Sequence, residues 1–296
     1  MIMPELPEVE TIKNDLIQKI VGRKITDITA LWPEIVKDMP FESFKKAVIG
    51  QRIINVKRRA KNLIVELTDD TALLIHLKMT GHVLVTDASN EVNEVGKWIK
   101  TDNQLLSDDP QNQFIRIIFY FDDKTMMAMS DLRKFAYIKL VSTEDLNKFL
   151  AEYGPEPFDP EFTVAVFQTM LQSKGLAIKK VLMDQHILSG VGNIYADEIL
   201  WASRVHPQTS AKKLSSEEIN AIYDNMKKIL QNAIEKRGTS TSDFRDTTGK
   251  KGTFGDSRNA YRMTGLPCAR CSTPIKRISL GGRGTHFCPV CQKEKP

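Results

Sequence analysis

Four cysteines offer the clearest chemistry in this sequence, and all of them lie after residue 267. They form two C-x2-C pairs, Cys268-Ala-Arg-Cys271 and Cys288-Pro-Val-Cys291, which sixteen residues separate. Two thiolate pairs on tight turns complete a closed tetrahedral shell around zinc and leave no open position for a catalytic water. The alternative is four unrelated thiols. We expect one structural Zn²⁺ on Cys268, Cys271, Cys288 and Cys291, in a reducing compartment rather than in a disulfide framework.

The segment between the two pairs carries Gly281-Gly282-Arg283-Gly284-Thr285, which we expect at the tip of a hairpin. Glycines permit close backbone approach to a ligand, and Arg283 offers a forked cation suited to phosphate. Residues 266–296 carry six basic side chains against one acidic side chain, whereas the rest of the chain has 36 of each. A solvated basic tail is one interpretation of this charge, and a surface for a polyanion is the other.

A second candidate phosphate site lies at Gly190-Val191-Gly192-Asn193, between two expected helices. Asn193 suits the N-cap of the second helix, and a glycine-flanked helix start exposes amides that bind phosphate. Lys174, Lys179 and Lys180 lie upstream and add positive charge. An ordinary helix–turn–helix connection is the alternative.

The elements that position these residues follow from hydrophobic periodicity. Pro7, early acidic residues and an apolar stripe predict a helix over residues 7–20. Short runs rich in Ile, Leu and Val predict strands at 24–31, 52–58, 62–67, 72–77, 115–121, 126–130 and 137–141. Seven such runs indicate a β-sandwich or barrel. Helices are expected at 161–174, 179–186, 194–202 and 216–236, beyond a proline-marked boundary at 155–160. The polar stretch 86–112 exceeds a usual connection, which indicates a disordered or functional insertion.

The composition excludes other classes of protein. The 296 residues are 41% hydrophobic and 27% charged, which is typical of a globular chain and not of a disordered one. No apolar run is long enough to cross a membrane. The first residues lack the basic and apolar regions of a signal peptide, so we expect a cytoplasmic protein.

Pro4-Glu5-Leu6-Pro7-Glu8-Val9-Glu10 by itself indicates only a proline-marked helix start. Further motifs occur with it in order: Arg58-Arg59-Ala60-Lys61, His76-Leu77-Lys78-Met79-Thr80-Gly81, Asp131-Leu132-Arg133-Lys134-Phe135, residues 190–195 and Gly-Arg-Gly-Thr-His-Phe-Cys. Over nearly its whole length the sequence resembles the bacterial formamidopyrimidine-DNA glycosylases (the Fpg/Nei family). The resemblance implies an α+β multidomain fold, in which a β-sandwich flanked by helices precedes a helix–two-turn–helix domain and a zinc finger. We expect a catalytic domain at 1–145, a linker at 146–160, a helical domain at 161–262 with a lesion loop at 238–258, and the zinc finger at 263–296.

The resemblance also implies an activity and its residues. Such enzymes excise oxidised purines, 8-oxoguanine and formamidopyrimidines, from double-stranded DNA and then cut the abasic strand. Pro4 matches the nucleophilic N-terminal proline, and Glu5 matches the carboxyl that protonates the opening sugar. Lys61 and Arg283 match cations that hold phosphates and assist the eliminations. The implied protein is a bacterial, nucleoid-associated monomer that needs no cofactor beyond the structural zinc.

The remaining matched residues are expected to contact DNA. Extruding a nucleotide leaves a gap in the duplex, which an apolar wedge and a hydrogen-bond donor can fill. By resemblance Met79, Arg133 and Phe135 fill it, with Arg133 facing the orphaned cytosine; the alternative for Met79 and Phe135 is core packing. Phosphate contacts are expected from Lys174, Lys179, Asn193, Tyr195 and Tyr261.

Some features depart from the family. Met1-Ile2 precede Met3-Pro4, and an acylated proline nitrogen is not nucleophilic, so we expect Met3 to be the true initiator. A usual histidine is replaced by Phe114, with Arg116 nearby. Three alternatives remain open: the sister enzyme for oxidised pyrimidines, which Leu6 and the long lesion loop disfavour; a catalytically inactive DNA-binding module; and a zinc-ribbon transcription factor.

Overall fold

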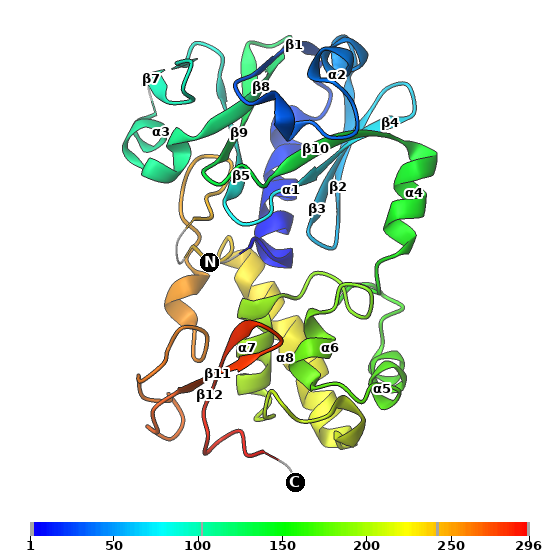
Figure 1. The fold of residues 1–296 in the computed structure, drawn as a ribbon, viewed down its shortest axis with the longest axis vertical. Helices are drawn as coiled ribbons and strands as arrows, with labels where there is room; N and C mark the ends of the chain where they lie inside the picture. The colour runs from blue at the N-terminus through cyan, green and yellow to red at the C-terminus, as the bar shows by residue number, and fades with distance from the viewer. Residues whose placement is uncertain (1–2, 102, 241–242, 295–296) are drawn as a thin grey trace. The chain divides into compact units, whose positions relative to one another are not determined.

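Two antiparallel four-stranded sheets form the N-terminal part of the protein (Figure 1). This computed structural model describes residues 3–101, 103–240 and 243–294. The first sheet has the order β1 (Ile25–Ala30), β8 (Ile115–Phe121), β9 (Thr125–Asp131) and β5 (Gly81–Asp87). The second has the order β10 (Tyr137–Ser142), β4 (Thr71–His76), β3 (Asn62–Leu67) and β2 (Ile53–Arg59). The predicted β-sandwich is confirmed.

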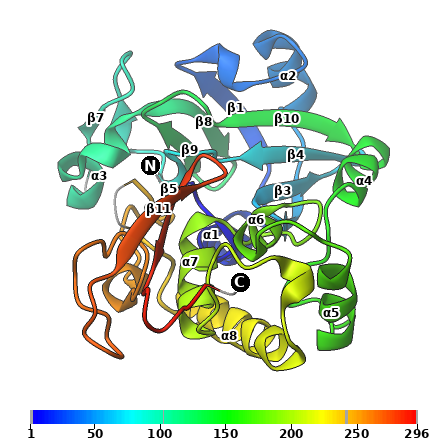
Figure 2. The same cartoon turned by 60° about the horizontal axis from the view of Figure 1, so that its bottom comes forward.

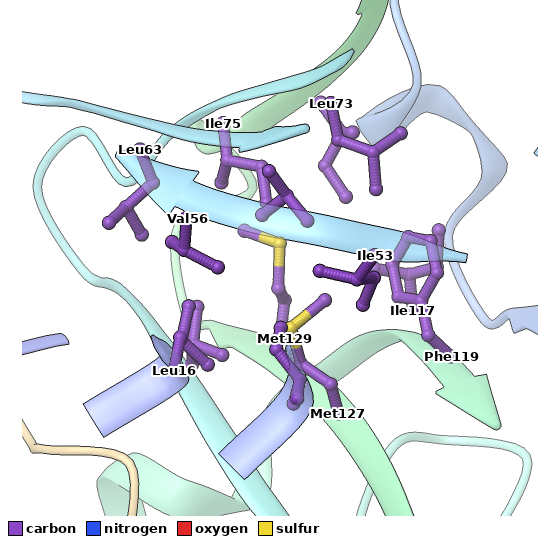
Figure 3. Close-up of a cluster of buried hydrophobic side chains, with 14 of the residues drawn as sticks. Leu16, Ile53, Val56, Leu63, Leu73, Ile75, Ile117, Phe119, Met127 and Met129 are labelled. Atoms are coloured by element: carbon purple, nitrogen blue, oxygen red, sulfur yellow. The ribbon is translucent and has the colours of Figure 1, made fainter. Parts of the chain in front are cut away.

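The core lies between the sheets, because inward-pointing side chains of both pack on one another. Figure 3 shows Val56 and Leu63 of the second sheet close to Met127 and Met129 of the first. All four side chains are at most 1% exposed. Burying each such side chain contributes about 1.5–3 kcal/mol, which makes this cluster the main stabilising feature of the sandwich.

All seven predicted strands are present, and β5 is a strand of the sandwich that the sequence pattern missed. Its sequence, Gly81-His82-Val83-Leu84-Val85-Thr86-Asp87, has only three consecutive apolar residues between a glycine and a polar end. Its pairing with β9 in register from Gly81 opposite Asp131 to Asp87 opposite Thr125 supplies the stability that local propensity lacks.

Helix α1 (Leu6–Ile20) confirms the helix predicted at 7–20. Its expected stripe, Val9, Ile12, Leu16 and Ile20, is completely buried and joins the core of the sandwich. Pro7 lies in the first turn, and the chain turns away at Gly22, whose φ of 85° suits glycine.

Helices α2 (Phe41–Val48) and α4 (Thr143–Ala151) were not predicted. Helix α2 sets Phe44 edge-on against Phe119 of β8. Helix α4 lies where the sequence predicted the start of a linker. Its Leu146 packs on Ile64 and Leu74, which belong to the outer face of the second sheet. Both helices are short, so their amphipathic periodicity is weak evidence in a sequence.

The insertion at 86–112 has regular structure. It contains β6 (Glu91–Val92), β7 (Trp98–Lys100), helix α3 (Gln104–Asp108) and most of a 3₁₀ turn, η2 (Pro110–Gln113). Trp98 and Leu106 cover Ile115 and Ile118 on the outer face of the first sheet. The insertion is therefore ordered because it buries a second apolar face of β8, and Trp98 packs locally.

The C-terminal part is helical and ends in a β-hairpin. Its helices are α5 (Val164–Gln172), α6 (Ile178–Met183), α7 (Asn193–Ala202) and α8 (Ser216–Glu235), and it also contains the 3₁₀ turns η3 (Ala211–Lys213) and η4 (Phe254–Ser257). A further 3₁₀ turn, η1 (Pro33–Ile35), belongs to the sandwich. The hairpin consists of β11 (Lys276–Leu280) and β12 (Arg283–Phe287), and β12 lies beside α7 (Figure 2). All four predicted helices are present, each within three residues of its expected bounds.

The chain divides into two compact units. The first comprises residues 1–150 with 236–253, and the second comprises 151–235 with 254–296. The expected lesion loop at 238–258 is thus split, and most of it packs with the sandwich rather than with the helical domain. Among the described residues no helix has the length and apolar character needed to traverse a lipid bilayer.

Candidate functional site

Pro4 and Glu5 stand immediately before α1, and both are buried. Glu5 is the N-cap of the helix and forms a capping box with Glu8. The backbone amide of Glu5 donates to Glu8 Oε2 at 2.9 Å. The positive end of the helix dipole favours negative charge here, and the capping box fixes the direction in which Pro4 enters. Met1 and Ile2 lie outside the described residues.

Glu8 is a site residue that the sequence interpretation missed. It is 1% exposed, and its Oε1 accepts a hydrogen bond from the Thr239 amide at 2.7 Å. A Cβ on Gly238 would lie 2.9 Å from the same carboxylate oxygen, so the close approach requires glycine at that position. One carboxylate therefore connects the Glu5 backbone to segment 236–253. The sequence did contain a signal for this role, because Glu8 lies three residues after the N-cap Glu5, which is the spacing of a capping box.

Lys61 lies in the turn between β2 and β3 and is 5% exposed. Asn62, the next residue, pairs with His76 of β4. Burial, followed by the charges of Lys78 and Lys61, lowers the pKa of His76 to about 3. The His76 Nδ1 accepts a hydrogen bond from the Lys78 amide at 2.9 Å. A neutral imidazole thus accompanies two cations, an arrangement suited to holding phosphate.

Met79, Arg133 and Phe135, which are expected by resemblance to fill the gap in the duplex, lie next to one another. Arg133 Nη1 lies 3.2 Å from Met79 Sδ, and its guanidinium lies 4.4 Å from the centre of the Phe135 ring. Phe135 is 48% exposed, which excludes core packing as its role. An exposed aromatic ring with a stacked guanidinium is suited to contact with bases.

Asp131 holds the turn that carries Arg133 and Phe135, and sequence reasoning did not single it out. Its side chain is completely buried. Its Oδ1 accepts hydrogen bonds from the Thr80 hydroxyl and the Arg133 amide, and its Oδ2 accepts from the amides of Phe135 and Ala136 at 2.7 and 2.8 Å. The available signal was an aspartate placed directly before a turn.

In the second unit, Lys179 is turned inward. It is 1% exposed, and its Nζ lies 2.6 Å from Asp197 Oδ1 and 2.8 Å from Thr285 Oγ1. The other oxygen of Asp197 accepts from the backbone amide and Nδ1 of His286. This network joins α6, α7 and β12. The expected phosphate contact of Lys179 does not fit this conformation, because the ammonium is enclosed by protein.

Tyr195 and Tyr261 are also buried, at 0% and 4% exposure. Tyr195 packs on Phe254, and the Tyr261 amide donates to Glu198 Oε1 at 2.8 Å. The Glu198 carboxylate also accepts the amides of residues 259 and 260, yet burial raises its pKa. Adjacent acids in the otherwise apolar helix α7 were the signal for these buried partners.

Three candidate phosphate ligands remain near the surface. Lys174 is partly exposed, and Arg283 is exposed at the hairpin tip, where Gly281 and Gly282 adopt positive φ angles of 58° and 72°. Asn193 is the first residue of α7 rather than its cap, which is Gly192, and its Nδ2 donates to the Gly284 carbonyl at 3.2 Å. The glycine-rich tip expected around Arg283 is thus present.

The Sγ atoms of all four cysteines lie within 4.8 Å of one another. Cys271 Sγ lies 3.4 Å from the sulfurs of both Cys288 and Cys291. Four Zn–S bonds of about 2.3 Å at tetrahedral angles require similar spacing. Burial, with hydrogen bonds to Cys271 and Cys288, raises the pKa of Cys291 to about 12, so the full set of thiolates needs a cation. This donor set fits one structural zinc ion.

The sandwich, the helical unit and the four-cysteine ribbon together have the fold of a DNA glycosylase. Residues 3–138 match the formamidopyrimidine-DNA glycosylase N-terminal domain, 153–245 its H2TH domain, and 265–293 the zinc finger found in FPG and IleRS. The chain belongs to the formamidopyrimidine-DNA glycosylase family, and the predictions of family, fold class and structural zinc are confirmed.

Individual relatives resemble the chain over almost its full length. The formamidopyrimidine-DNA glycosylase of Herpetosiphon aurantiacus is 40% identical over 98% of this chain and 100% of its own, and that of Listeria innocua is 38% identical over the same shares. Among solved structures, Lactococcus lactis Fpg in complex with abasic-site DNA has a TM-score of 0.84 at 34% identity, covering 98% of this chain and 100% of its own.

Proposed function

We propose that this protein is a bifunctional DNA glycosylase and abasic-site lyase that removes oxidised purines, 8-oxoguanine and formamidopyrimidines, from double-stranded DNA. The observation that carries the proposal is the placement of Pro4 directly before a buried Glu5, whose backbone is fixed by Glu8 at the start of α1. The relatives are named formamidopyrimidine-DNA glycosylases, and Lactococcus lactis Fpg has been solved with Fapy-dG-containing DNA.

In the proposed reaction the Pro4 nitrogen supplies the electron pair that forms a bond to C1′. A secondary amine with a pKa of about 8 has a useful neutral fraction at physiological pH. The bond from C1′ to the base breaks, and its electron pair leaves with the base, which takes up the proton that the Pro4 nitrogen loses. Glu5 gives a proton to the sugar ring oxygen as the C1′–O4′ bond opens, which leaves an iminium between C1′ and Pro4.

The iminium then acts as an electron sink. When C2′ loses a proton, the electron pair of that bond moves toward the iminium, and the 3′ phosphate then leaves. Loss of a second proton from the sugar expels the 5′ phosphate. Lys61 and Arg283 hold and neutralise these phosphates. Water hydrolyses the iminium and restores the amine. The reaction uses no redox cofactor, and zinc only stabilises the ribbon that presents Arg283.

Access to C1′ requires extrusion of the nucleotide, which costs a few kcal/mol. Phe135 and Met79 replace the lost stacking, and Arg133 supplies donors to the orphaned base. Lys174, Asn193, Tyr195 and Tyr261 are proposed to contact the backbone of duplex DNA, and Lys179 to contact it only if its network with Asp197 opens. We further propose that the enzyme acts as a monomer in the bacterial cytoplasm, associated with the nucleoid.

A second substrate class is oxidised pyrimidines. One structure of Lactococcus lactis Fpg contains oxidised-pyrimidine DNA, at 34% identity to this chain. Side-by-side excision of 8-oxoguanine opposite cytosine and of thymine glycol ranks the two classes. Faster removal of thymine glycol would contradict the assignment to purines.

Borohydride trapping tests the nucleophile. Protein that begins at Pro4 should form a covalent adduct with lesion-containing duplex, and the Pro4→Gly variant should form far less of this adduct. Protein that retains residues 1–3 should form none, because its proline nitrogen is an amide. Glu5→Gln should slow base excision more than it weakens DNA binding. If a Pro4-initiated chain binds lesions but never forms an adduct, the protein is instead a DNA-binding module. If it binds a specific DNA sequence and does not cleave the strand, it is a transcription factor.

A further inference from the structure

The insertion at 86–112 and segment 236–253 interlock within the first unit. Arg245 is 3% exposed, and its Nε and Nη2 donate to both carboxylate oxygens of Asp109 at 2.6 and 3.0 Å. A two-pronged arginine–carboxylate pair fixes both position and orientation, and burial shields it from salt. Asp109 also caps η2 by accepting the Gln111 amide.

Asn112 forms a second connection. Its side chain is completely buried, and its Oδ1 lies 3.0 Å from His82 Nε2 of β5. Its Nδ2 donates to the carbonyls of Leu105 at 2.7 Å and Gly249 at 3.4 Å. A Cβ on Gly249 would lie 2.7 Å from the same nitrogen, and Gly249 has a φ of 83°. Glycine is therefore required for the segment to lie against the insertion.

The other side of the segment is fixed to the sandwich. The Val85 amide of β5 donates to the Thr247 carbonyl at 2.9 Å, and the Thr247 hydroxyl lies 2.7 Å from Lys19 Nζ and from Asp15 Oδ2 of α1. Arg237 donates to Asp246 and to the same Asp15. The described residues of the segment, 236–240 and 243–253, are thus held between α1, β5 and the insertion.

This arrangement reaches the catalytic pair through Glu8. At its first residues the segment supplies the Thr239 amide to Glu8 Oε1, and Glu8 Oε2 accepts the Glu5 amide. Because a carboxylate shared by two amides moves with both, displacement of segment 236–253 moves the backbone of Glu5. A shift of about 1 Å in a catalytic group can cost 10²-fold in rate.

We propose that the insertion is a brace that orders residues 243–253 and, through Thr239 and Glu8, positions Glu5 for base removal. Asp109, Asn112 and Arg245 are then positioning residues. The inference rests on the proposed function for its kinetic consequence, but the ordering itself is a property of the free protein.

The base-removal step should depend on the brace more than abasic-site cleavage does. An intact nucleoside needs its ring oxygen protonated by Glu5 as the glycosidic bond breaks. An abasic site already opens to an aldehyde, and Pro4 can attack it with less help from an acid. Loss of the brace should therefore slow base removal more than it slows cleavage at an abasic site, although Pro4 is the nucleophile in both reactions.

The test compares Asp109→Asn and Gly249→Ala with a control, Glu91→Gln. Glu91 forms an ion pair with Lys100 in the same insertion, with side chains 56% and 66% exposed. Hydrogen–deuterium exchange of residues 243–253 in the free protein is the first measurement. We expect exchange about tenfold faster in both brace variants and unchanged in the control, as local opening becomes easier.

Single-turnover cleavage of 8-oxoguanine duplex and of a preformed abasic-site duplex is the second measurement. We expect excision about tenfold slower in the brace variants, with abasic-site cleavage within about twofold of the wild type. Unchanged exchange at residues 243–253 would overturn the brace, and equal loss of both activities would overturn its link to Glu5. If the wild-type chain cleaves neither substrate, the proposed function fails, while the exchange result still decides whether the insertion orders the segment.

Discussion

Lys179 Nζ lies 2.6 Å from Asp197 Oδ1, and both side chains are at most 1% exposed. The pair joins α6 to α7, and Asp197 also fixes His286 in the zinc ribbon. Removing one partner of a buried pair leaves an uncompensated charge. A lysine in a basic motif therefore stabilises the second unit here.

We expect Lys179→Met to lower the free energy of unfolding by about 3–5 kcal/mol, because it removes one partner of a buried ion pair and leaves Asp197 in the interior. Urea unfolding followed by circular dichroism measures the effect. Lys180→Met is the matched control, since Lys180 is the next residue and is exposed. If Lys179→Met instead left stability unchanged and weakened DNA binding, Lys179 would be a phosphate ligand and its ammonium would leave Asp197 in the complex.

Zinc removal should disorder the ribbon and leave the sandwich folded. Cys268 and Cys288 pack in a small cluster with Ile275, Trp201 and Met263, so metal–thiolate bonds supply most of the local stability. Mass spectrometry under native conditions should find one zinc per chain and none in Cys271→Ser, which should also lose affinity for duplex DNA. Glu294→Gln, an exposed change in the same segment, should retain the metal. Full DNA affinity without zinc would contradict a structural role.

The sequence allowed the prediction of elements that have strong local patterns. Helix α1 was predictable from Pro7 and its apolar stripe, and the zinc ligands from their spacing. Strand β5 was not, because its stability comes from pairing with β9 rather than from its own residues. The insertion looked like a loop because its few apolar residues, Trp98 and Leu106 among them, are scattered among polar ones. Their burial depends on Ile115 and Ile118 on the outer face of β8.

The site was predictable to the extent that its residues belong to short motifs. Met79, Arg133 and Phe135 were singled out by resemblance, whereas their support was not, because the hydrogen bonds that Asp131 accepts from the amides of Phe135 and Ala136 become visible only in the folded turn. Glu8 and Thr239 are 231 positions apart, a contact that local patterns do not encode. Lys179 was expected to contact phosphate by resemblance, and its burial was not foreseen because its partner, Asp197, lies on another helix.

His82 should make stability depend on pH. Burial, the largest cause, lowers its pKa to about 4, against an unfolded value of 6.5. The unfolded chain therefore binds more protons between pH 6.5 and 4, so the contribution of His82 is complete above pH 6.5 and is lost as the pH falls toward 4. Between pH 7 and pH 5 the protonation of His82 should lower the free energy of unfolding by about 2 kcal/mol.

Urea unfolding of wild type and His82→Gln at pH 7 and pH 5 measures that loss. Between pH 7 and pH 5 the free energy of unfolding should fall by about 2 kcal/mol less in His82→Gln than in the wild type. At pH 7 the variant should be less stable than the wild type. His186→Gln, an exposed substitution, controls for the loss of a histidine. Parallel pH profiles for wild type and His82→Gln would show that His82 is not held neutral by burial.

Asp131 should act on DNA through the turn that it holds. In Asp131→Ala the buried amides of Phe135 and Ala136 lose their acceptor, at a cost of about 1–3 kcal/mol each, and the turn should rearrange. Arg133 and Phe135 then lose their fixed positions, so we expect affinity for lesion-containing duplex to fall about tenfold, or about 1.4 kcal/mol. Leu132→Ala, a change at a side chain that is 44% exposed in the same turn, should have a smaller effect.

A double-mutant cycle separates positioning from general destabilisation. Phe135→Ala removes the ring that Asp131 positions, so the two substitutions should not be additive in binding free energy, and the double variant should bind about as weakly as Phe135→Ala alone. Fluorescence anisotropy with lesion-containing and undamaged duplexes measures both affinities. Additive losses would mean that Asp131 supports binding elsewhere, and an equal loss on undamaged DNA would mean that the turn holds the duplex without probing the base pair.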